Sequence, residues 1–307
     1  MGETPLWTLV ASPVALALLA YAAAVLDRSL GAVAAGHRGA LRAWGEPARG
    51  AVRLLVQQRR ATFASDRLLA RIGVLALPVA ALLAAVVIPL GTEAVAGMRV
   101  GVVWFNAMEV GVWGAVWLTG WGANSAYALI GGYRFLAQGL AYELPHMFAL
   151  ITAALGAGSL DLAEVAAAQH DLWFAVWMPV AFAVYLISAA AMVFWGPLDH
   201  PVGADLAGGA AVELSGPDRL VFMAGRYALL VVVAAAAVPL FLGGDEGPLL
   251  PAPAWSLIKT SAVLALLVWT AHRLPVLRMD RFVAAAWTVL IPAALLQALV
   301  VAIVVVG

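Results

Sequence analysis

The segment GWGANSAYALIGGYRFLAQGLAYELPHMF, residues 120–148, decides the fold, because it is apolar enough for a bilayer yet keeps three strongly polar residues. These are Arg134, Gln138 and Glu143. A charged side chain at the centre of a membrane helix costs about 3 kcal/mol on insertion scales, so such residues usually face a protein interior or a water-filled cavity. The segment therefore predicts a membrane helix inside a bundle, with its ionisable groups retained for a reason.

The composition extends this prediction to the whole chain of 307 residues. Hydrophobic residues make up 64%, charged residues 11%, and the mean hydropathy is +0.98, which is typical of an integral membrane protein. The apolar runs are close to the ~20 residues that a helix needs to cross the hydrocarbon core. The first run has no basic segment before it, which favours a retained helix over a cleaved signal peptide. We predict an all-α integral membrane protein, a single transmembrane domain over residues 1–307, with eight spans at residues 5–26, 72–90, 100–119, 127–155, 172–195, 221–242, 255–272 and 283–305.

The distribution of charge predicts the orientation. Residues 27–71 hold nine of the seventeen Lys and Arg residues. Together with Arg219, Arg273, Arg278 and Arg281, thirteen fall on alternate loops, whereas the other loops hold only Arg99. Basic loops stay in the cytoplasm, so we expect a multi-pass protein of the bacterial inner membrane with both termini outside.

The long basic first loop contains a second kind of signal. Residues 43–58 mix apolar residues, such as Trp44 and Leu54, with Arg49 and Arg53. This pattern predicts an amphipathic surface helix whose arginines reach lipid head groups or an attached partner. A basic tether that only fixes the topology is the alternative.

Several function classes are excluded by what the chain lacks. It has no cysteine, so it offers no thiolate ligand for a metal or an iron–sulfur cluster. Its five histidines show no ligand spacing, and the net charge of zero argues against nucleic acid as a partner. We expect no metal and no cofactor bound by this chain alone, and any redox centre to belong to a partner.

The fourth predicted span carries a polar stripe. Tyr127 and Arg134 are seven positions apart on one helical face, Gln138 follows one turn later, and Tyr142 one turn after that. Glu143 lies half a turn away from Arg134, so the two cannot pair within the helix. Each is therefore expected to find its partner on another span.

Five ionisable residues fall inside predicted spans, and a static buried ion pair is the alternative to function for each of them. For Glu143 we favour function, because a carboxyl group in a low dielectric can titrate as a proton relay requires. For Glu109 and Lys259 both interpretations stay open, as they do for Arg134. Arg226 starts an apolar run and is expected to extend to the interface.

The loop GPLDHPVGADLAGGAAVELSGPDR, residues 196–219, is rich in Gly and Pro and is therefore expected to be irregular. It holds four acids on a side where positive charge dominates. They fit either a solvated loop or acids that line the mouth of a cavity. The four are Asp199, Asp205, Glu213 and Asp218.

Residues 120–145 resemble the signature of a complex I (NADH-quinone oxidoreductase) family, that of the H-type membrane subunits, also known as the mitochondrial subunit 1 type. This signature is usually close to GWxSNSKYALLGAxRxxAQxxSYE. Further landmarks follow in the family's order along nearly the whole chain. They are ASDRLLARIGVLALPVAA (64–81), LDHP (198–201), ELSG (213–216), WSLIKTSAVLALLVWTAHRLPVLRMDRF (255–282) and AAWTVLIPAAL (285–295).

The resemblance implies a subunit at the heel of the membrane arm of a complex I-like respiratory assembly. Such a subunit anchors the hydrophilic redox arm, forms part of the quinone chamber, and couples electron transfer to proton translocation. Quinone would be a substrate at the interface with partner subunits, and the chain would not be catalytic alone. The residues implied are Glu143, Glu213, Asp199 and Glu109 for the relay or chamber; Arg28, Arg42 and Arg219 for the chamber or for docking; and Tyr127, Arg134, Gln138, Tyr142, Lys259, Arg273, Arg278 and Asp280 as structural polar positions.

The chain departs from the family where the family is acidic. Val202 and Ala204 stand where two glutamates are usual, and Arg226 replaces another glutamate. Ala126 replaces the lysine of the signature. Glu109 stands where apolar residues are usual, and we hypothesise that it replaces some of the lost charge.

Three alternatives remain beside this interpretation. The chain could be the equivalent subunit of a membrane-bound hydrogenase or a formate hydrogenlyase, whose signature is less similar. It could also be a structural adaptor that has lost coupling. A free-standing transporter is disfavoured, because no internal repeat is visible.

Overall fold

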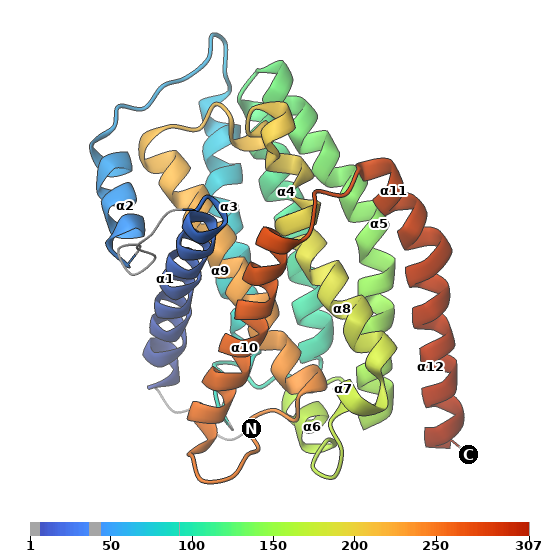
Figure 1. The fold of residues 1–307 in the computed structure, drawn as a ribbon. Helices are drawn as coiled ribbons and strands as arrows, with labels where there is room; N and C mark the ends of the chain where they lie inside the picture. Colours follow the sequence, from blue (N-terminus) through green and yellow to red (C-terminus); the bar gives the residue numbers. More distant parts are fainter. Residues whose placement is uncertain (1–6, 37–43, 92, 307) are drawn as a thin grey trace.

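The computed structural model describes residues 7–36, 44–91 and 93–306, which form a helical bundle (Figure 1). Strands are absent from these ranges apart from an isolated bridge between Leu90 and Glu93. In the described part of the chain the helices are α1 (Thr8–Ala34), α2 (Glu46–Val56), α3 (Arg67–Ala85), α4 (Gly101–Gly122), α5 (Ala126–Ala157), α6 (Leu162–Ala167), α7 (Phe174–Trp177), α8 (Pro179–Met192), α9 (Gly216–Phe241), α10 (Ala252–Arg273), α11 (Met279–Ala285) and α12 (Ile291–Val306).

Seven helical segments within the described ranges are long and apolar enough to cross a membrane. They are α1, α3, α4, α5, α9, α10 and the rod made of α11, a π-helical turn (η6, Ala286–Leu290) and α12. Proline lacks an N–H, so Pro292, the second residue of α12, cannot continue the α-helical ladder. The widened π turn ends at Leu290, directly before the start of α12. The all-helical membrane fold predicted from the sequence is therefore confirmed.

The eighth predicted span, residues 172–195, is not one helix. It consists of α7, a break at Met178, and α8, which has only 14 residues. A residue before proline avoids the helical region, so Pro179 accounts for the break. At 1.5 Å per residue α8 is about 21 Å long, shorter than the ~30 Å hydrocarbon core. The predicted count of eight spans is therefore not confirmed.

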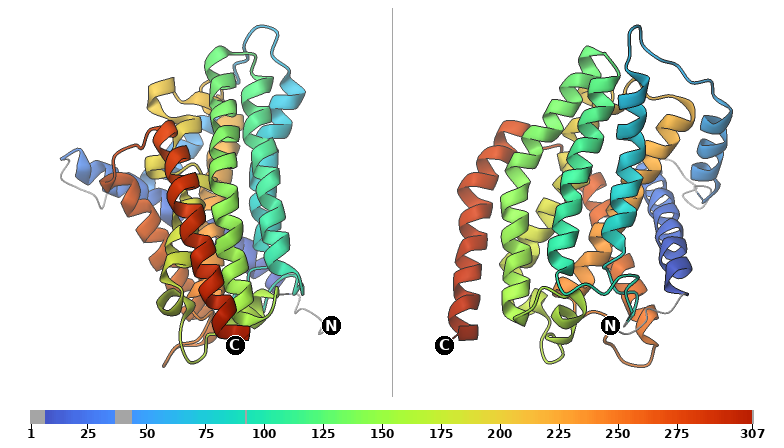
Figure 2. Two further views of the ribbon diagram at one scale, coloured as in Figure 1. Left: turned by 90° about the vertical axis from the view of Figure 1, so that its right-hand side faces the viewer. Right: turned by 180° about the vertical axis from the view of Figure 1, so that it is seen from behind.

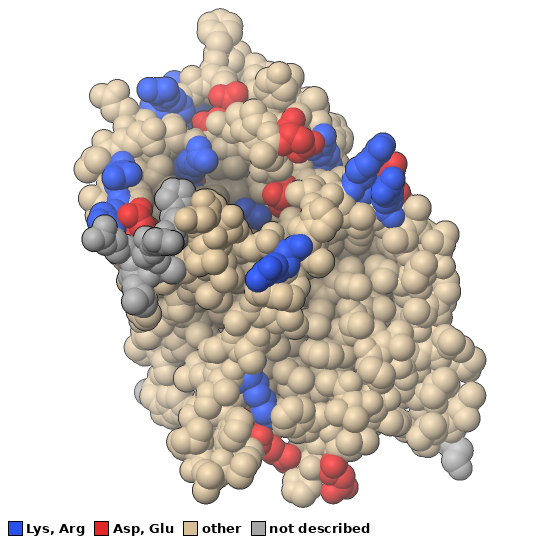
Figure 3. Space-filling view, in the orientation of Figure 1, with Lys and Arg blue, Asp and Glu red and all other residues tan. Residues whose placement is uncertain are grey.

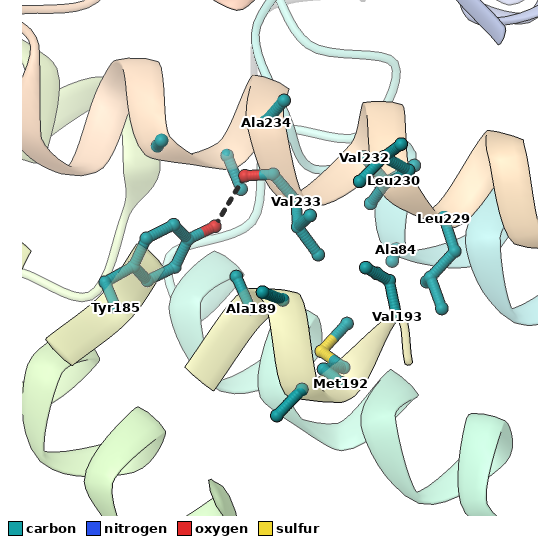
Figure 4. Packing of buried hydrophobic residues seen from close by; sticks show 14 of the residues in the cluster. Ala84, Tyr185, Ala189, Met192, Val193, Leu229, Leu230, Val232, Val233 and Ala234 are labelled. Atoms are coloured by element: carbon teal, nitrogen blue, oxygen red, sulfur yellow. Dashed lines mark hydrogen bonds between the residues drawn. The ribbon is translucent and has the colours of Figure 1, made fainter. Parts of the chain in front are cut away.

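The short helix α8 packs its C-terminal end in the interior, whereas Val180 and Ile187 are exposed. It contacts α5, α9 and α12, and residues 188–195 are all buried. The Tyr185 hydroxyl donates a hydrogen bond of 2.7 Å to the carbonyl oxygen of Val233 on α9 (Figure 4). This bond satisfies a buried hydroxyl and fixes the height of α8 against α9.

Small residues bring the helices close together. A Cβ on Gly73 of α3 would lie 2.7 Å from the Ala115 carbonyl oxygen of α4, and one on Gly120 would lie 2.4 Å from the Ala128 carbonyl oxygen of α5. Such contacts between backbones are typical of membrane bundles. The rod ending in α12 covers α5 at one edge of the bundle, and α1 with α2 forms the opposite edge (Figure 2).

The two ends of the bundle differ in charge. We call the end that carries residues 44–66, 193–219 and 274–281 the basic end. Figure 3 shows Lys and Arg side chains gathered there, together with acids and a hollow in the surface. Helix α1 begins and α12 ends at the opposite end (Figure 1). Which end faces the cytoplasm stays a prediction.

Candidate functional site: an apolar cavity and a polar layer

A cavity of about 500 Å³ lies between α1, α2, α3 and α9. We call it the α1–α9 cavity. Its lining runs along α1 from Pro13 to Arg28, about 22 Å at the rise of an α-helix. The walls are mostly small and aliphatic side chains, so the cavity suits a long apolar molecule.

Helix α2 supplies one wall and confirms the predicted helix within residues 43–58. Pro47, Gly50, Ala51 and Leu54 follow a helical spacing, are half-buried, and line the cavity. The other face of α2 is exposed. Two of the four lining residues are very small, and this leaves the space open.

Polar groups gather at the basic end of this cavity. Arg28 of α1 and Arg219 of α9 both line it, so two residues predicted to serve a ligand are brought together. Two phenols, Tyr21 and Tyr227, also line it. Arg42, the third predicted residue, lies outside the described residues.

The loop of residues 196–215 packs as a layer against α5. It is therefore not a solvated loop that lies away from the bundle. It contains four 3₁₀ turns, and the second and fourth of them pack on α5. Arg134 of α5 makes an ion pair of 2.7 Å with Asp205 in this loop. The prediction that Arg134 pairs with another span is therefore wrong. The turns are η2 (Gly196–Leu198), η3 (His200–Val202), η4 (Ala204–Leu206) and η5 (Gly209–Ala211).

Gln138 is the centre of this layer and is fully buried. Its Nε2 donates to the carbonyl oxygens of Ala191 (2.7 Å) and Leu198 (2.9 Å). Its Oε1 lies 2.7 Å from Nδ1 of His200, whose other ring nitrogen contacts the carbonyl oxygen of Leu277. One amide thus joins α5 to the end of α8, to the loop and to the segment before α11.

Replacing Gly131 by alanine is expected to dislodge this layer. The new Cβ would lie 2.1 Å from the backbone nitrogen of Ala210 and 2.6 Å from the carbonyl oxygen of Pro201, so the loop must move. Overpacking of this kind costs about 1–3 kcal/mol. Limited proteolysis and the thermal midpoint in detergent measure the change. Gly114→Ala is the control, because no atom lies within 4 Å of its Cβ position. Equal behaviour of the two variants would contradict the packing.

The four acids of the loop do not line the α1–α9 cavity. Asp199 is half-buried, and burial raises the pKa of its carboxyl group, opposed by the charges of Arg226 and His200. Glu213 accepts a 2.8 Å hydrogen bond from the Ser125 hydroxyl. Two of the four, Glu213 and Asp218, line a separate pocket at the basic end, as the interpretation of acids that line a cavity expects.

Arg226 is held beneath the loop and does not extend to the interface. It donates a hydrogen bond to the carbonyl oxygen of Phe194. Its guanidinium lies 4.9 Å from the ring centroid of Phe194 and 4.7 Å from that of Trp195. The snorkelling interpretation is wrong, because these aromatic rings and the carbonyl offer the cation a nearer partner than the interface.

A second hollow, of about 210 Å³, lies at the basic end between the start of α3 and the loop; we call it the basic pocket. Arg59 makes an ion pair of 3.3 Å with Asp218 there. Four arginines face two acids, so the pocket favours an anionic group. The charged residues that line it are Arg59, Arg60, Arg67, Arg71, Glu213 and Asp218.

Glu109 of α4 lies against His146 of α5 inside the bundle. Glu109 Oε1 is 2.9 Å from His146 Nε2, and the two side chains are 1% and 0% exposed. The contact is not aligned as a hydrogen bond, and all four polar atoms lack a hydrogen-bond partner among the described residues. The His146 ring packs 5.1 Å from that of Tyr185. The sequence suggested no partner for Glu109, because a lone histidine 37 positions away carries no recognisable pattern.

Glu143 lies one turn before His146 on α5. Its side chain is half-buried, and it has no hydrogen bond or ion pair with any described residue. The expectation of a deeply buried acid with a partner on another span is therefore wrong for this chain taken alone. Next to it, the buried Tyr142 hydroxyl accepts a 2.9 Å hydrogen bond from Trp113 Nε1. Tyr127 is 55% exposed and takes no part in the layer that the loop of residues 196–215 forms around Gln138.

The closing signature supplies structural contacts. Lys259 donates to the carbonyl oxygens of residues 242, 244 and 246 at 2.7–2.9 Å and lies 4.5 Å from the Trp173 ring centroid. These hydrogen bonds hold the segment that follows α9 against α10. Arg273 lies 6.0 Å from the Trp269 ring centroid, and Arg278 makes an exposed 3.2 Å ion pair with Asp280.

Comparisons with known proteins place these features in context. The family model described as NADH dehydrogenase matches residues 6–302. The chain is 40% identical to an H-type subunit of NADH-quinone oxidoreductase from Geobacter sulfurreducens over 208 residues, 67% of this chain and 63% of that protein. It is 38% identical to the corresponding protein of Syntrophobacter fumaroxidans over 232 residues, 72% and 70% of the two chains. The alignments thus span less than two thirds of the Geobacter relative.

Proposed function

Since this chain belongs to the NADH dehydrogenase family, among the H-type membrane subunits of complex I, we propose that it is a membrane subunit of a complex I-like quinone oxidoreductase. In this proposal the chain forms one wall of a quinone chamber and holds no redox centre of its own. The α1–α9 cavity is the observation that carries it. Its apolar length of about 22 Å suits an isoprenoid tail, and Arg28 and Arg219 offer hydrogen-bond donors to a head group.

The basic end is proposed to face the cytoplasm and to dock the hydrophilic arm. The basic pocket favours acidic side chains of a partner, because four arginines there exceed the two acids. The positive-inside rule gives the same orientation for a bacterial inner-membrane protein, with both termini outside.

Glu143, with Glu109 and His146, is proposed to form the part of a proton relay that lies in this chain. Charge facing lipid is costly, so the half-exposed Glu143 supports a neighbouring membrane subunit that covers this face of α5. Glu109 and His146 are sealed from lipid. The relay would serve coupling between electron transfer and proton translocation.

Filling the cavity tests the chamber. Ala20→Phe places a ring inside it, because Ala20 lines the cavity, whereas Ala22→Phe on the same helix points away from it. In membranes that contain the assembled complex, we expect Ala20→Phe to raise the apparent KM for a short-chain ubiquinone or menaquinone analogue roughly tenfold, which equals about 1.4 kcal/mol. Ala22→Phe should match the unaltered chain. If both variants reduce quinone normally, the chamber assignment fails.

A further inference from the structure

Phe63 is an aromatic side chain that the basic end exposes almost completely. It lies in the loop of residues 57–66, which joins α2 to α3 and reaches beyond the loops beside it (Figure 1). Its side chain is 95% exposed, so the ring contributes almost nothing to the packing of this chain. Isolated exposed apolar side chains are common on protein surfaces, so exposure alone assigns no role to Phe63.

The backbone on both sides of Phe63 is held in place. Asn124, in the turn between α4 and α5, donates a 3.1 Å hydrogen bond from Nδ2 to the carbonyl oxygen of Phe63. The Thr62 hydroxyl donates to the carbonyl oxygen of Ala123 in the same turn. Ala64 has a left-handed backbone with φ 55°, which residues other than glycine rarely adopt. The loop therefore presents the ring from a fixed backbone, which lowers the entropy lost when a partner covers it.

Unpaired positive charge surrounds this ring. Arg60 and Arg67 lie three and four positions from Phe63, and both line the basic pocket together with Arg71. These three arginines are exposed and make no ion pair with any residue that the structure describes. Asp66, the acid of the loop, is engaged by the first backbone amides of α3 at 3.0 Å. The surface thus combines an aromatic ring with cations that are free to meet acids of another molecule.

The position of Phe63 distinguishes a soluble partner from lipid. Helix α3 has 19 residues and is about 28 Å long, close to the ~30 Å of the hydrocarbon core. Phe63 lies four positions before its first residue, Arg67, in a loop that extends away from the bundle, so the ring lies beyond the apolar layer. A second copy of this chain fits poorly, because a two-fold contact here would bring arginines against arginines.

We propose that Phe63 anchors the soluble partner at the basic end. Its ring enters an apolar pocket of that partner, and Asp or Glu side chains on the rim of the pocket meet Arg60, Arg67 and Arg71. The inference rests on the proposed docking of the hydrophilic arm at this end, and it names the side chain that carries the largest share of the binding energy. A few central aromatic residues with polar residues around them dominate many protein interfaces.

Phe63→Ala tests the anchor, and Leu249→Ala is the matched control. Leu249 is 104% exposed, lies in a loop at the opposite end, and also has a left-handed backbone with φ 71°. In the assembled complex purified in detergent, we expect Phe63→Ala to raise the rate constant for dissociation of the hydrophilic arm about 30-fold. Leu249→Ala should leave it unchanged. Size-exclusion chromatography of samples taken over time measures the fraction still assembled.

The double variant Arg60→Gln with Arg67→Gln separates the ring from the charges. It should weaken the dependence of arm dissociation on salt concentration, whereas Phe63→Ala should leave that dependence as it is. If the double variant speeds dissociation and Phe63→Ala does not, the anchor fails and docking at the basic end stands. If neither variant changes the rate constant, docking at the basic end fails as well.

A thiol probe tests what covers the ring. The chain has no cysteine, so Phe63→Cys gives it a single thiol. In detergent-opened membranes washed free of the hydrophilic arm, a water-soluble maleimide should label Phe63→Cys, and the assembled complex should protect it. Leu249→Cys should react to the same extent in both. Labelling of Phe63→Cys in the assembled complex would overturn the inference. So would its protection in the washed membranes, since lipid or this chain itself would then cover the position.

Discussion

Replacing Glu109 by leucine is expected to destabilise the protein by about 1–3 kcal/mol, the usual cost of leaving a buried polar group without its partner. His146 would remain fully buried, and with Glu109 gone it would lack its 2.9 Å neighbour. Thermal or denaturant unfolding of the purified protein in detergent measures the loss.

The double variant Glu109→Leu with His146→Phe provides the control. Phenylalanine keeps the ring contact with Tyr185 and leaves no polar atom to satisfy. The double variant should be more stable than the sum of the two single changes predicts, by about 0.5–3 kcal/mol. Strict additivity would contradict a direct interaction between Glu109 and His146.

Replacing Glu143 by glutamine is expected to abolish most proton pumping while leaving the complex assembled. Glutamine is nearly isosteric, and Glu143 has no hydrogen bond or ion pair with any described residue, so this chain loses no contact. A relay acid, in contrast, cannot be replaced by a group that does not ionise. Fluorescence quenching of a pH-sensitive dye in inverted membrane vesicles, driven by NADH and quinone, reports the gradient.

Glu164→Gln is the matched control for this experiment. Glu164 lies at the end of the bundle opposite the basic end, where it accepts a hydrogen bond of 2.5 Å from Ser159. Pumping should be normal in this variant. Normal pumping in Glu143→Gln as well would favour an adaptor that kept the fold and lost coupling.

The sequence was most informative about the helices themselves. Long apolar runs leave a membrane helix as the main way to satisfy backbone polar groups, so seven long segments were predictable. The break at Met178 was not predicted, because the apolar run continues through Pro179 and hides its effect on the backbone. Pro179 was the one signal in the sequence that could have predicted this break.

The contact partners of the polar side chains were harder to predict than the helix faces on which these side chains lie. Gln138 was correctly expected in the core, but its contacts lie 53 to 62 positions away, on α8 and the loop. Periodicity identifies the face that a residue occupies and does not identify what packs on that face. The same reason explains why Arg134 was assigned to another span instead of Asp205, and why the contacts of Asp27 with Tyr227 and His272 were not predicted.

The shortness of α8 has a consequence for biogenesis. A stretch of 14 residues is a weak stop for the insertion machinery, and two of the three long helices that it contacts, α9 and α12, are synthesised after it. Its final position therefore depends on the arrival of later helices, and ribosome-bound chains that end before α9 should leave this segment open to labelling from the aqueous side.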